Sequence, residues 1–235
     1  MIFARLADDN AMCVLRQALI LDVDGYETPI FSADGRHLAI RGNAYENRVD
    51  VFEFPSLKRV LGTVLGEPGP AAADGYMDEW YEQFDAWSRH NLAFGTRPGV
   101  LWIGTPAGSL IEVDVDEAAA VAHDVLNDSP VTTLTATTTG EFVVASGDGE
   151  LRLVRPVSEP ADAVDGIALR DSVTAFLDAT SEVPDDSDLD EQLIRTDGTR
   201  TWEQDNLETV TSASTADQTW LQLRALGNTV RNQQQ

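Results

Sequence analysis

Three aspartates alternate late in the chain, at Asp186, Asp188 and Asp190. Carboxylates with this spacing are the first ligands of a calcium-binding loop. Such a loop also needs glycine at its sixth position and glutamate at its twelfth, where this sequence has Glu191 and Asp197. We therefore interpret the acidic stretch as a solvated linker and expect no metal site here.

Histidine and cysteine are too few and too scattered to build other metal chemistry. The chain has His37, His90 and His123, and its single cysteine is Cys13. A zinc site draws three or four such ligands together. The sequence also lacks the G-x-S-x-G elbow of a serine nucleophile and the glycine-rich loops that cradle phosphates. We expect no catalytic residues and no cofactor.

The strongest candidate site is an aromatic segment between residues 67 and 89. Large apolar side chains recur there at three- and four-residue steps, and acidic residues fill the other side, so the pattern predicts an amphipathic helix over 74–88. Tryptophan and tyrosine are also favoured in interface hot spots. Packing on the rest of the protein is the alternative role. The candidate interaction residues are Tyr76, Trp80, Tyr81, Phe84 and Trp87.

The β-strands that must position this aromatic segment belong to a pattern that repeats along the chain. Residues 99–114 and 140–155 align without a gap at a spacing of 41, and a looser copy starts at Gly35. A period near 40 built of short strands and glycine turns is typical of β-propeller blades. Within residues 28–156 we expect consecutive four-stranded antiparallel sheets, with inner strands near 37–41, 100–105 and 141–146.

The repeats resemble the WD-repeat and related bacterial β-propeller families. The likeness lies in the segments FSADGRHLAI, VLWIGTPAGSLIEVD and EFVVASGDGELRLV, each a strand, a turn and a further strand. No Gly-His pair opens a blade, and Phe52-Glu53, Val113-Asp114 and Val154-Arg155 stand where the family's closing Trp-Asp pair would lie. The resemblance implies a rigid platform that binds proteins or peptides, and it identifies no active residues.

The domain organisation follows from where the repeats start and stop. We expect a mainly β chain with propeller-like blades over 1–156, a helical insert at about 67–89, an acidic linker with a short helix over 157–190, and a small α/β appendage over 191–235. Three blades are recognisable. Residues 2–24 or the hairpin at 193–202 would supply a fourth, so the ring is either incomplete or completed by a second subunit. A last helix near 216–227 is expected to pack on the propeller.

Composition limits the partners. The chain has 235 residues and a net charge of −24, from 40 acidic and 16 basic residues. Such a charge repels nucleic-acid phosphates and anionic lipids, so we expect neither as a partner. No run of 18 apolar residues suggests a membrane span, the N-terminus does not resemble a secretory signal, and one cysteine suits a reducing compartment, so we expect a cytoplasmic protein.

The function hypothesis combines these observations. We expect a non-catalytic protein-interaction scaffold or adaptor that binds a protein partner or a second copy of itself. The alternative is an enzyme or binder of a small ligand or divalent cation, using an acidic propeller mouth. The absence of a nucleophile or metal motif favours the scaffold.

Overall fold

The chain divides into two compact units in a computed structural model. The structure describes residues 2–6, 12–20, 27, 29–42, 46–66, 77–156, 171, 174–176, 193–197, 199–217 and 219–233. We call Val23–Pro55 with Arg59–Thr174 the blade unit, and Met1–Asp22, Ser56–Lys58 and Ala175–Gln235 the terminal unit.

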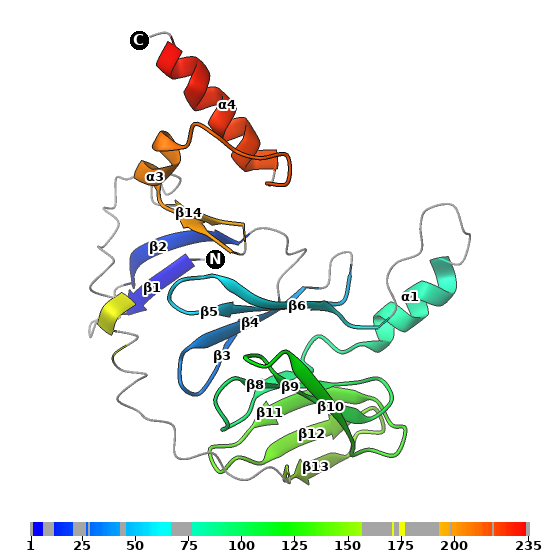
Figure 1. The fold of residues 1–235 in the computed structure, drawn as a ribbon. Helices are drawn as coiled ribbons and strands as arrows, with labels where there is room; N and C mark the ends of the chain where they lie inside the picture. Colours follow the sequence, from blue (N-terminus) through cyan, green and yellow to red (C-terminus); the bar gives the residue numbers. More distant parts are fainter. Residues whose placement is uncertain are drawn as a thin grey trace. The chain divides into compact units, whose positions relative to one another are not determined.

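The blade unit contains three consecutive antiparallel sheets, which confirms the expected propeller-like architecture (Figure 1). The first sheet has strands β3 (Ile30–Phe31), β4 (His37–Gly42), β5 (Arg48–Glu53) and β6 (Arg59–Val64). The second has β7 (Leu92–Phe94), β8 (Val100–Gly104), β9 (Ser109–Asp114) and β10 (Ala119–Asp124). The third has β11 (Val131–Ala136), β12 (Phe142–Ser146) and β13 (Leu151–Val154). It has three strands, not four, within the described residues.

The strands of each sheet follow the chain in order. Sequential hairpins give the orders β3-β4-β5-β6, β10-β9-β8-β7 and β11-β12-β13. The expected inner strands are β4, β8 and β12, and each lies inside its sheet between two neighbouring strands. The first strand of each sheet contacts the first strand of the neighbouring sheet: β7 contacts both β3 and β11. Residues near 37–41, 100–105 and 141–146 are extended as expected, and each of these strands is hydrogen-bonded on both sides.

Two hydrophobic cores separate the three sheets, with the second sheet between them. Side chains alternate along a strand, so one strand can supply both cores. Leu101 and Ile103 of β8 join the core that contains Val49 and Val51 of the first sheet. Trp102, between them in sequence, joins the core that contains Phe142 and Val144 of the third sheet, along with residues such as Val100, Leu110 and Leu134. The second sheet is therefore apolar on both faces.

The matched turns of the repeats are built alike. Thr105 accepts a hydrogen bond on its hydroxyl from the amide of Ser109 at 3.0 Å, and Ser146 accepts one from the amide of Glu150 at 3.1 Å. The glycine preceding each donor, Gly108 or Gly149, has a φ near +80°, a conformation that other residues rarely adopt. This shared local chemistry explains why the 41-residue spacing appears in the sequence.

In the order of the chain, the expected helix falls between the first and second sheets. Helix α1 spans Met77–Ala86. Residues 67–76 of the aromatic segment lie outside the described residues. The helix is therefore an insertion in the connection from β6 to β7.

The terminal unit joins the two ends of the chain in one sheet. Its strands are β1 (Ile2–Leu6), β2 (Met12–Ile20), β14 (Leu193–Thr196) and β15 (Thr201–Trp202). Both segments that we considered for a fourth blade are thus in the same sheet, with β14 parallel to β2. The remaining pairs are antiparallel. This mixed sheet differs from the fully antiparallel sheets of the blade unit.

Two helices complete the described part of the terminal unit. Helix α3 spans Gln204–Thr209 and α4 spans Thr219–Gln233. Buried Asn228 on α4 donates hydrogen bonds of 2.8 Å to the carbonyls of Leu207 and Val210, which fixes α4 to α3. Leu223 and Leu226 of α4 are exposed. No helix in the described ranges has both the length and the apolar character needed to cross a membrane.

Candidate interaction surfaces

Asn47 anchors α1 to the first sheet. Its side-chain Nδ2 donates a 2.8 Å hydrogen bond to the carbonyl of Phe84 near the end of the helix. Its Oδ1 accepts a 2.6 Å hydrogen bond from Nη2 of the buried Arg41. Burial lowers the pKa of Arg41 to about 10, so the guanidinium stays charged at neutral pH. The helix is therefore held by a polar chain that begins inside the first sheet.

Trp87 follows α1 and packs into the molecule. It lies against the core shared by the first and second sheets, together with Leu65 and Leu92. Gly66 allows this packing, because a Cβ there would lie 2.8 Å from Nε1 of Trp87. Close approach of a backbone to a ring is a common reason for glycine. Of the candidate residues, Trp87 thus has a clear packing role.

The other described candidates are less covered. Trp80 contacts the rings of Tyr81 and Phe84, with centroid separations of 5.1 and 5.2 Å. Trp80 and Phe84 are half-buried and line a cavity of about 200 Å³ between α1 and the first sheet, whereas Tyr81 is 49% exposed. Tyr76 lies outside the described residues. The assignment of these residues to an interaction site stays a prediction.

The outward face of the third sheet is a second apolar surface, which sequence reasoning missed. We call it the outer face and define it by Val143, Ala145, Leu151 and Leu153. Leu153 pairs with Val143 and Leu151 with Ala145 across β12 and β13, so the four side chains share one face. Leu151 is 74% exposed and Leu153 is 62% exposed, while Val143 and Ala145 are half-buried.

The 41-residue repeat carried a signal for this surface. Trp102 aligns with Val143, and Leu110 aligns with Leu151. Trp102 and Leu110 face the third sheet and are buried in the core they share with it. Val143 and Leu151, at the equivalent positions, therefore face the side on which a following sheet would pack. The alignment alone could have predicted the apolar character of this face, but not its exposure.

The residues considered for metal chemistry lie apart. His37 is buried with its Nε2 3.6 Å from Asp116, His123 lies 3.0 Å from Glu112, and His90 is exposed. Among the residues that the structure describes, no group of three or more His, Cys, Asp or Glu is placed to hold a metal ion. The aspartates at 186, 188 and 190 lie outside that part of the chain.

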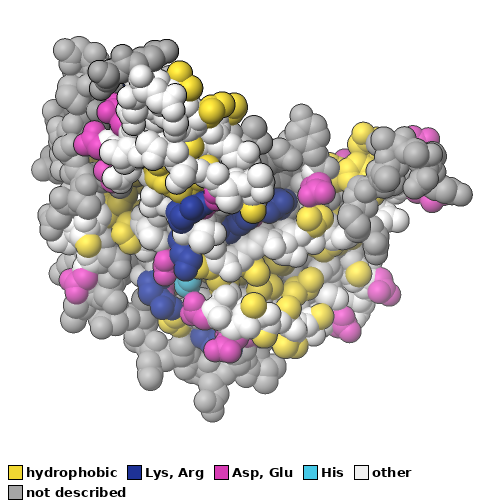
Figure 2. Space-filling view, turned by 45° about the horizontal axis from the view of Figure 1, so that its top comes forward, with side chains coloured by type: hydrophobic (Ala, Val, Ile, Leu, Met, Phe, Trp, Pro, Cys, Tyr) yellow, Lys and Arg dark blue, Asp and Glu magenta, His cyan; other side chains and the backbone are white. Residues whose placement is uncertain are grey.

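Acidic side chains are distributed over the surface. Figure 2 shows acidic side chains in several separate places, with hydrophobic side chains also exposed. On the third sheet, exposed Asp148 and Glu150 precede the apolar residues of β13. An acidic surface of this kind attracts positively charged partners over a distance of about 8 to 10 Å at physiological salt.

Comparisons with known proteins give only distant similarities. No protein-family model matches the chain, and no curated protein matches it. The solved structures to which the chain is similar include the dihydro-heme d1 dehydrogenase NirN in complex with DHE (20% identity, TM-score 0.40), the mitotic checkpoint complex (15%, 0.41) and the Myceliophteria thermophila Cps50 (Swd1) β-propeller domain (13%, 0.38). These similarities cover 59%, 68% and 60% of this chain, and 27%, 44% and 38% of the other chains. The chain thus spans less than half the length of each of these proteins.

Proposed function

We propose that this chain is a non-catalytic protein-interaction scaffold whose third sheet binds an extended segment of a partner protein. The observation that carries the proposal is the exposure of Leu151 and Leu153 on the terminal strand of a sheet that is apolar on both faces. Sheets with two apolar faces are normally covered on both. A strand at a sheet edge also presents unpaired backbone groups that can hydrogen-bond to an added strand.

The charge of the chain points to a basic partner. At −24, two copies of this protein repel each other, whereas a segment rich in lysine or arginine is attracted. The acidic pair Asp148 and Glu150 lies directly before β13. We therefore favour an extended segment that alternates apolar and basic residues, with its apolar side chains on the outer face.

Helix α1 supplies a second candidate contact for the same scaffold. Tyr81 is the most exposed of its described aromatic residues, and Trp80 and Phe84 lie beside it. Tyr76 and Trp87 remain in the candidate set from the sequence pattern. Because Cys13 is the only cysteine, a reducing cytoplasmic setting suits the scaffold.

A designed peptide tests the binding mode. We expect a fluorescein-labelled ten-residue peptide of alternating valine and lysine to bind the protein in a fluorescence anisotropy titration. The matched peptide of alternating valine and glutamate should not bind. The substitution Leu153→Asp should weaken binding at least tenfold, although it adds a negative charge that by itself would attract the basic peptide. Equal or tighter binding by Leu153→Asp would show simple charge attraction and overturn the proposal.

Two further measurements separate the competing roles. Sedimentation velocity should show a monomer over a hundredfold range of concentration, and a dimer that Leu153→Asp dissociates would identify a second copy as the occupant in place of a basic partner.

Calorimetric titration with calcium, magnesium or zinc should give no stoichiometric binding. Tight binding of one of these ions would favour the cation-dependent alternative.

A further inference from the structure

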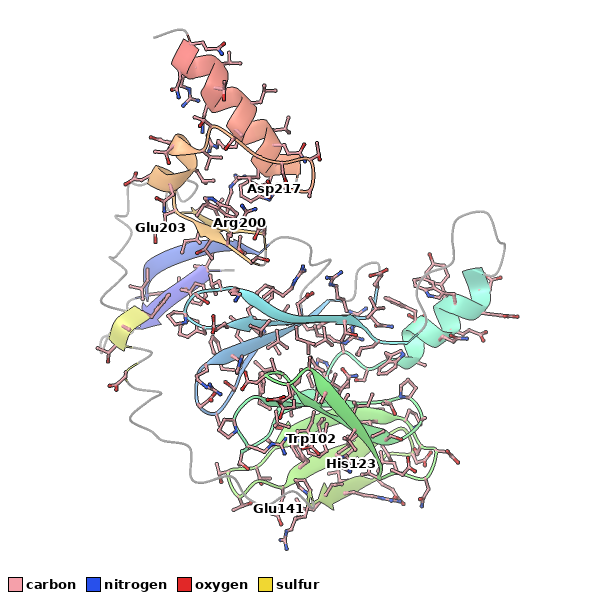
Figure 3. All side chains as sticks on the ribbon, viewed as in Figure 1. Trp102, His123, Glu141, Arg200, Glu203 and Asp217 are labelled. Atoms are coloured by element: carbon pink, nitrogen blue, oxygen red, sulfur yellow. The ribbon has the colours of Figure 1, made fainter. Side chains whose placement is uncertain are left out.

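A cleft opens between the second and third sheets, away from the outer face. Its volume is about 300 Å³, which is at the lower limit for pockets that hold small molecules. Its apolar lining includes Val100, Trp102 and Phe142. Figure 3 places Trp102 beside His123, and their rings are tilted at 34° with a centroid separation of 5.2 Å.

Gly95 leaves the edge of Trp102 accessible from the cleft. A Cβ at position 95 would lie 3.1 Å from Nε1 of Trp102, 3.4 Å from its Cδ1 and 3.5 Å from Cζ of Phe142. Any other residue would thus fill the space next to the indole N–H. This N–H makes no hydrogen bond to a described residue, and the backbone of Gly95 does not adopt the left-handed conformation. The glycine here preserves open space and is not needed for a turn.

The acidic groups of the cleft already have partners. Glu112 lies 3.2 Å from Nη2 of Arg97 and 3.0 Å from Nε2 of His123. Asp114 also lies 3.2 Å from Nη2 of Arg97. Arg97 thus uses one of its three guanidinium nitrogens for both carboxylates. Its remaining N–H groups are donors with no hydrogen bond among the described residues.

A second arginine lies at the exposed side of the cleft. Arg155, which lines the cavity, hydrogen-bonds to Glu141, and Thr139 donates to the other oxygen of that carboxylate at 3.1 Å. The hydrogen bond from Arg155 holds the pKa of Glu141 below its usual value, so the pair stays ionised at neutral pH. The cleft therefore presents donors, but its surroundings hold three carboxylates, of Glu112, Asp114 and Glu141, against two guanidinium groups.

We propose that this cleft binds an uncharged hydrogen-bond acceptor carried on a small apolar group, such as the amide carbonyl of a valine-sized peptide unit. The acceptor would face the N–H groups of Trp102 and Arg97, and the apolar part would contact Val100 and Phe142. A cation would be repelled by the positively polarised N–H groups of Trp102 and Arg97. An anion would be repelled by the excess of carboxylates. An uncharged amide avoids both costs.

Three probes of the same size test the ligand class. N-acetylvalinamide is neutral, N-acetylvaline is a carboxylate and valinamide is an amine. The chain has five tryptophans, and Trp102→Phe identifies which indole resonance in a ¹⁵N-labelled sample belongs to Trp102. We expect N-acetylvalinamide to shift that resonance saturably with a millimolar Kd, which is ordinary for so small a ligand. The other two probes should bind at least tenfold more weakly.

The variant Gly95→Ala tests the location. It places a methyl group in the cleft and should weaken binding of N-acetylvalinamide at least tenfold, while the other four indole resonances keep their positions. In the unsubstituted protein, magnetisation transfer from the probe's methyl groups to Trp102 and Phe142 ring protons gives a second readout that needs no variant. Leu153→Asp should bind the probe normally, so this site and the outer face are tested separately. An unshifted Trp102 resonance, tighter binding of a charged probe, or unchanged binding in Gly95→Ala would each overturn the proposal.

Discussion

Leu110 and Leu151 occupy equivalent positions 41 residues apart, yet Leu110 is fully buried and Leu151 is 74% exposed. Leu110 contributes to the core between the second and third sheets. Leu151 points to the side where no further sheet covers the third within the described residues. The repeat thus places an apolar residue at both positions, and only one of them is packed.

This relationship predicts different costs for one substitution. Leu110→Ala should lower the free energy of unfolding by about 2 to 5 kcal/mol, because it leaves a cavity in a packed core. Leu151→Ala should change it by less than about 0.5 kcal/mol, because the side chain is mostly in water. Urea denaturation followed by circular dichroism measures both. Equal costs at the two positions would show that Leu151 is covered in solution.

The repeats made the architecture predictable, because local chemistry produces them. The hydroxyl of Thr105 or Ser146 and the glycine three residues later form a turn that can be recognised in the sequence. Alternating apolar residues on each side of such turns predict paired strands. The antiparallel sheets and the helix between residues 67 and 89 follow from these patterns.

The positions of long-range contacts could not be predicted in the same way. The hydrogen bond from Asn47 to the carbonyl of Phe84 joins residues 37 apart, and no spacing in the sequence indicates it. The parallel pairing of β14 with β2 joins segments more than 170 residues apart. The cleft beside Trp102 depends on Gly95 in a different strand connection. Such features require the relative placement of elements, which periodicity does not provide.

A buried carboxylate should make the blade unit sensitive to acid. Burial raises the pKa of Asp34, but hydrogen bonds from Ser32 and Arg36 outweigh it, so the pKa lies below its ordinary value of 3.8. A pKa that is lower in the folded state stabilises the protein above the unfolded-state value, and this contribution is lost as the pH falls through the folded-state value.

The variant Asp34→Asn tests this dependence. At pH 7 it should lower the free energy of unfolding by about 1 to 3 kcal/mol, because Arg36 loses its charged partner. The difference from the unsubstituted protein should shrink as the pH falls below about 4. Asp148→Asn, in an exposed turn, removes the same charge and serves as the control. A difference that stays constant from pH 7 to pH 3 would contradict the prediction.

The terminal unit offers a separate test of how its helices are held. Asn228→Ala removes both hydrogen bonds from α4, to the carbonyls of Leu207 and Val210. The buried carbonyl of Leu207 and the half-buried carbonyl of Val210 then lack this donor, so the free energy of unfolding should fall by about 1 to 3 kcal/mol. Asn232→Ala, the same substitution at an exposed position of α4, is the matched control. Hydrogen exchange of the α4 amides would locate the effect, and unchanged exchange would argue against this anchoring role.

Two tryptophans at α1 should respond differently to truncation. Trp87 packs against the core of the first and second sheets, so Trp87→Ala should cost about 2 to 4 kcal/mol in the free energy of unfolding. Trp80 is half-buried beside a cavity of about 200 Å³, so Trp80→Ala should cost about 1 kcal/mol or less.

The same pair tests whether α1 contacts a partner. If Trp80, Tyr81 and Phe84 form a recognition surface, Trp80→Ala should weaken partner binding at least tenfold while the melting temperature changes little, since truncation of an interface tryptophan often costs 2 kcal/mol or more. Tyr81→Phe keeps the ring and removes only the hydroxyl group, so it controls for the apolar surface. If Trp80→Ala destabilises the protein as much as Trp87→Ala does, the aromatic residues of α1 serve packing, and the recognition role fails.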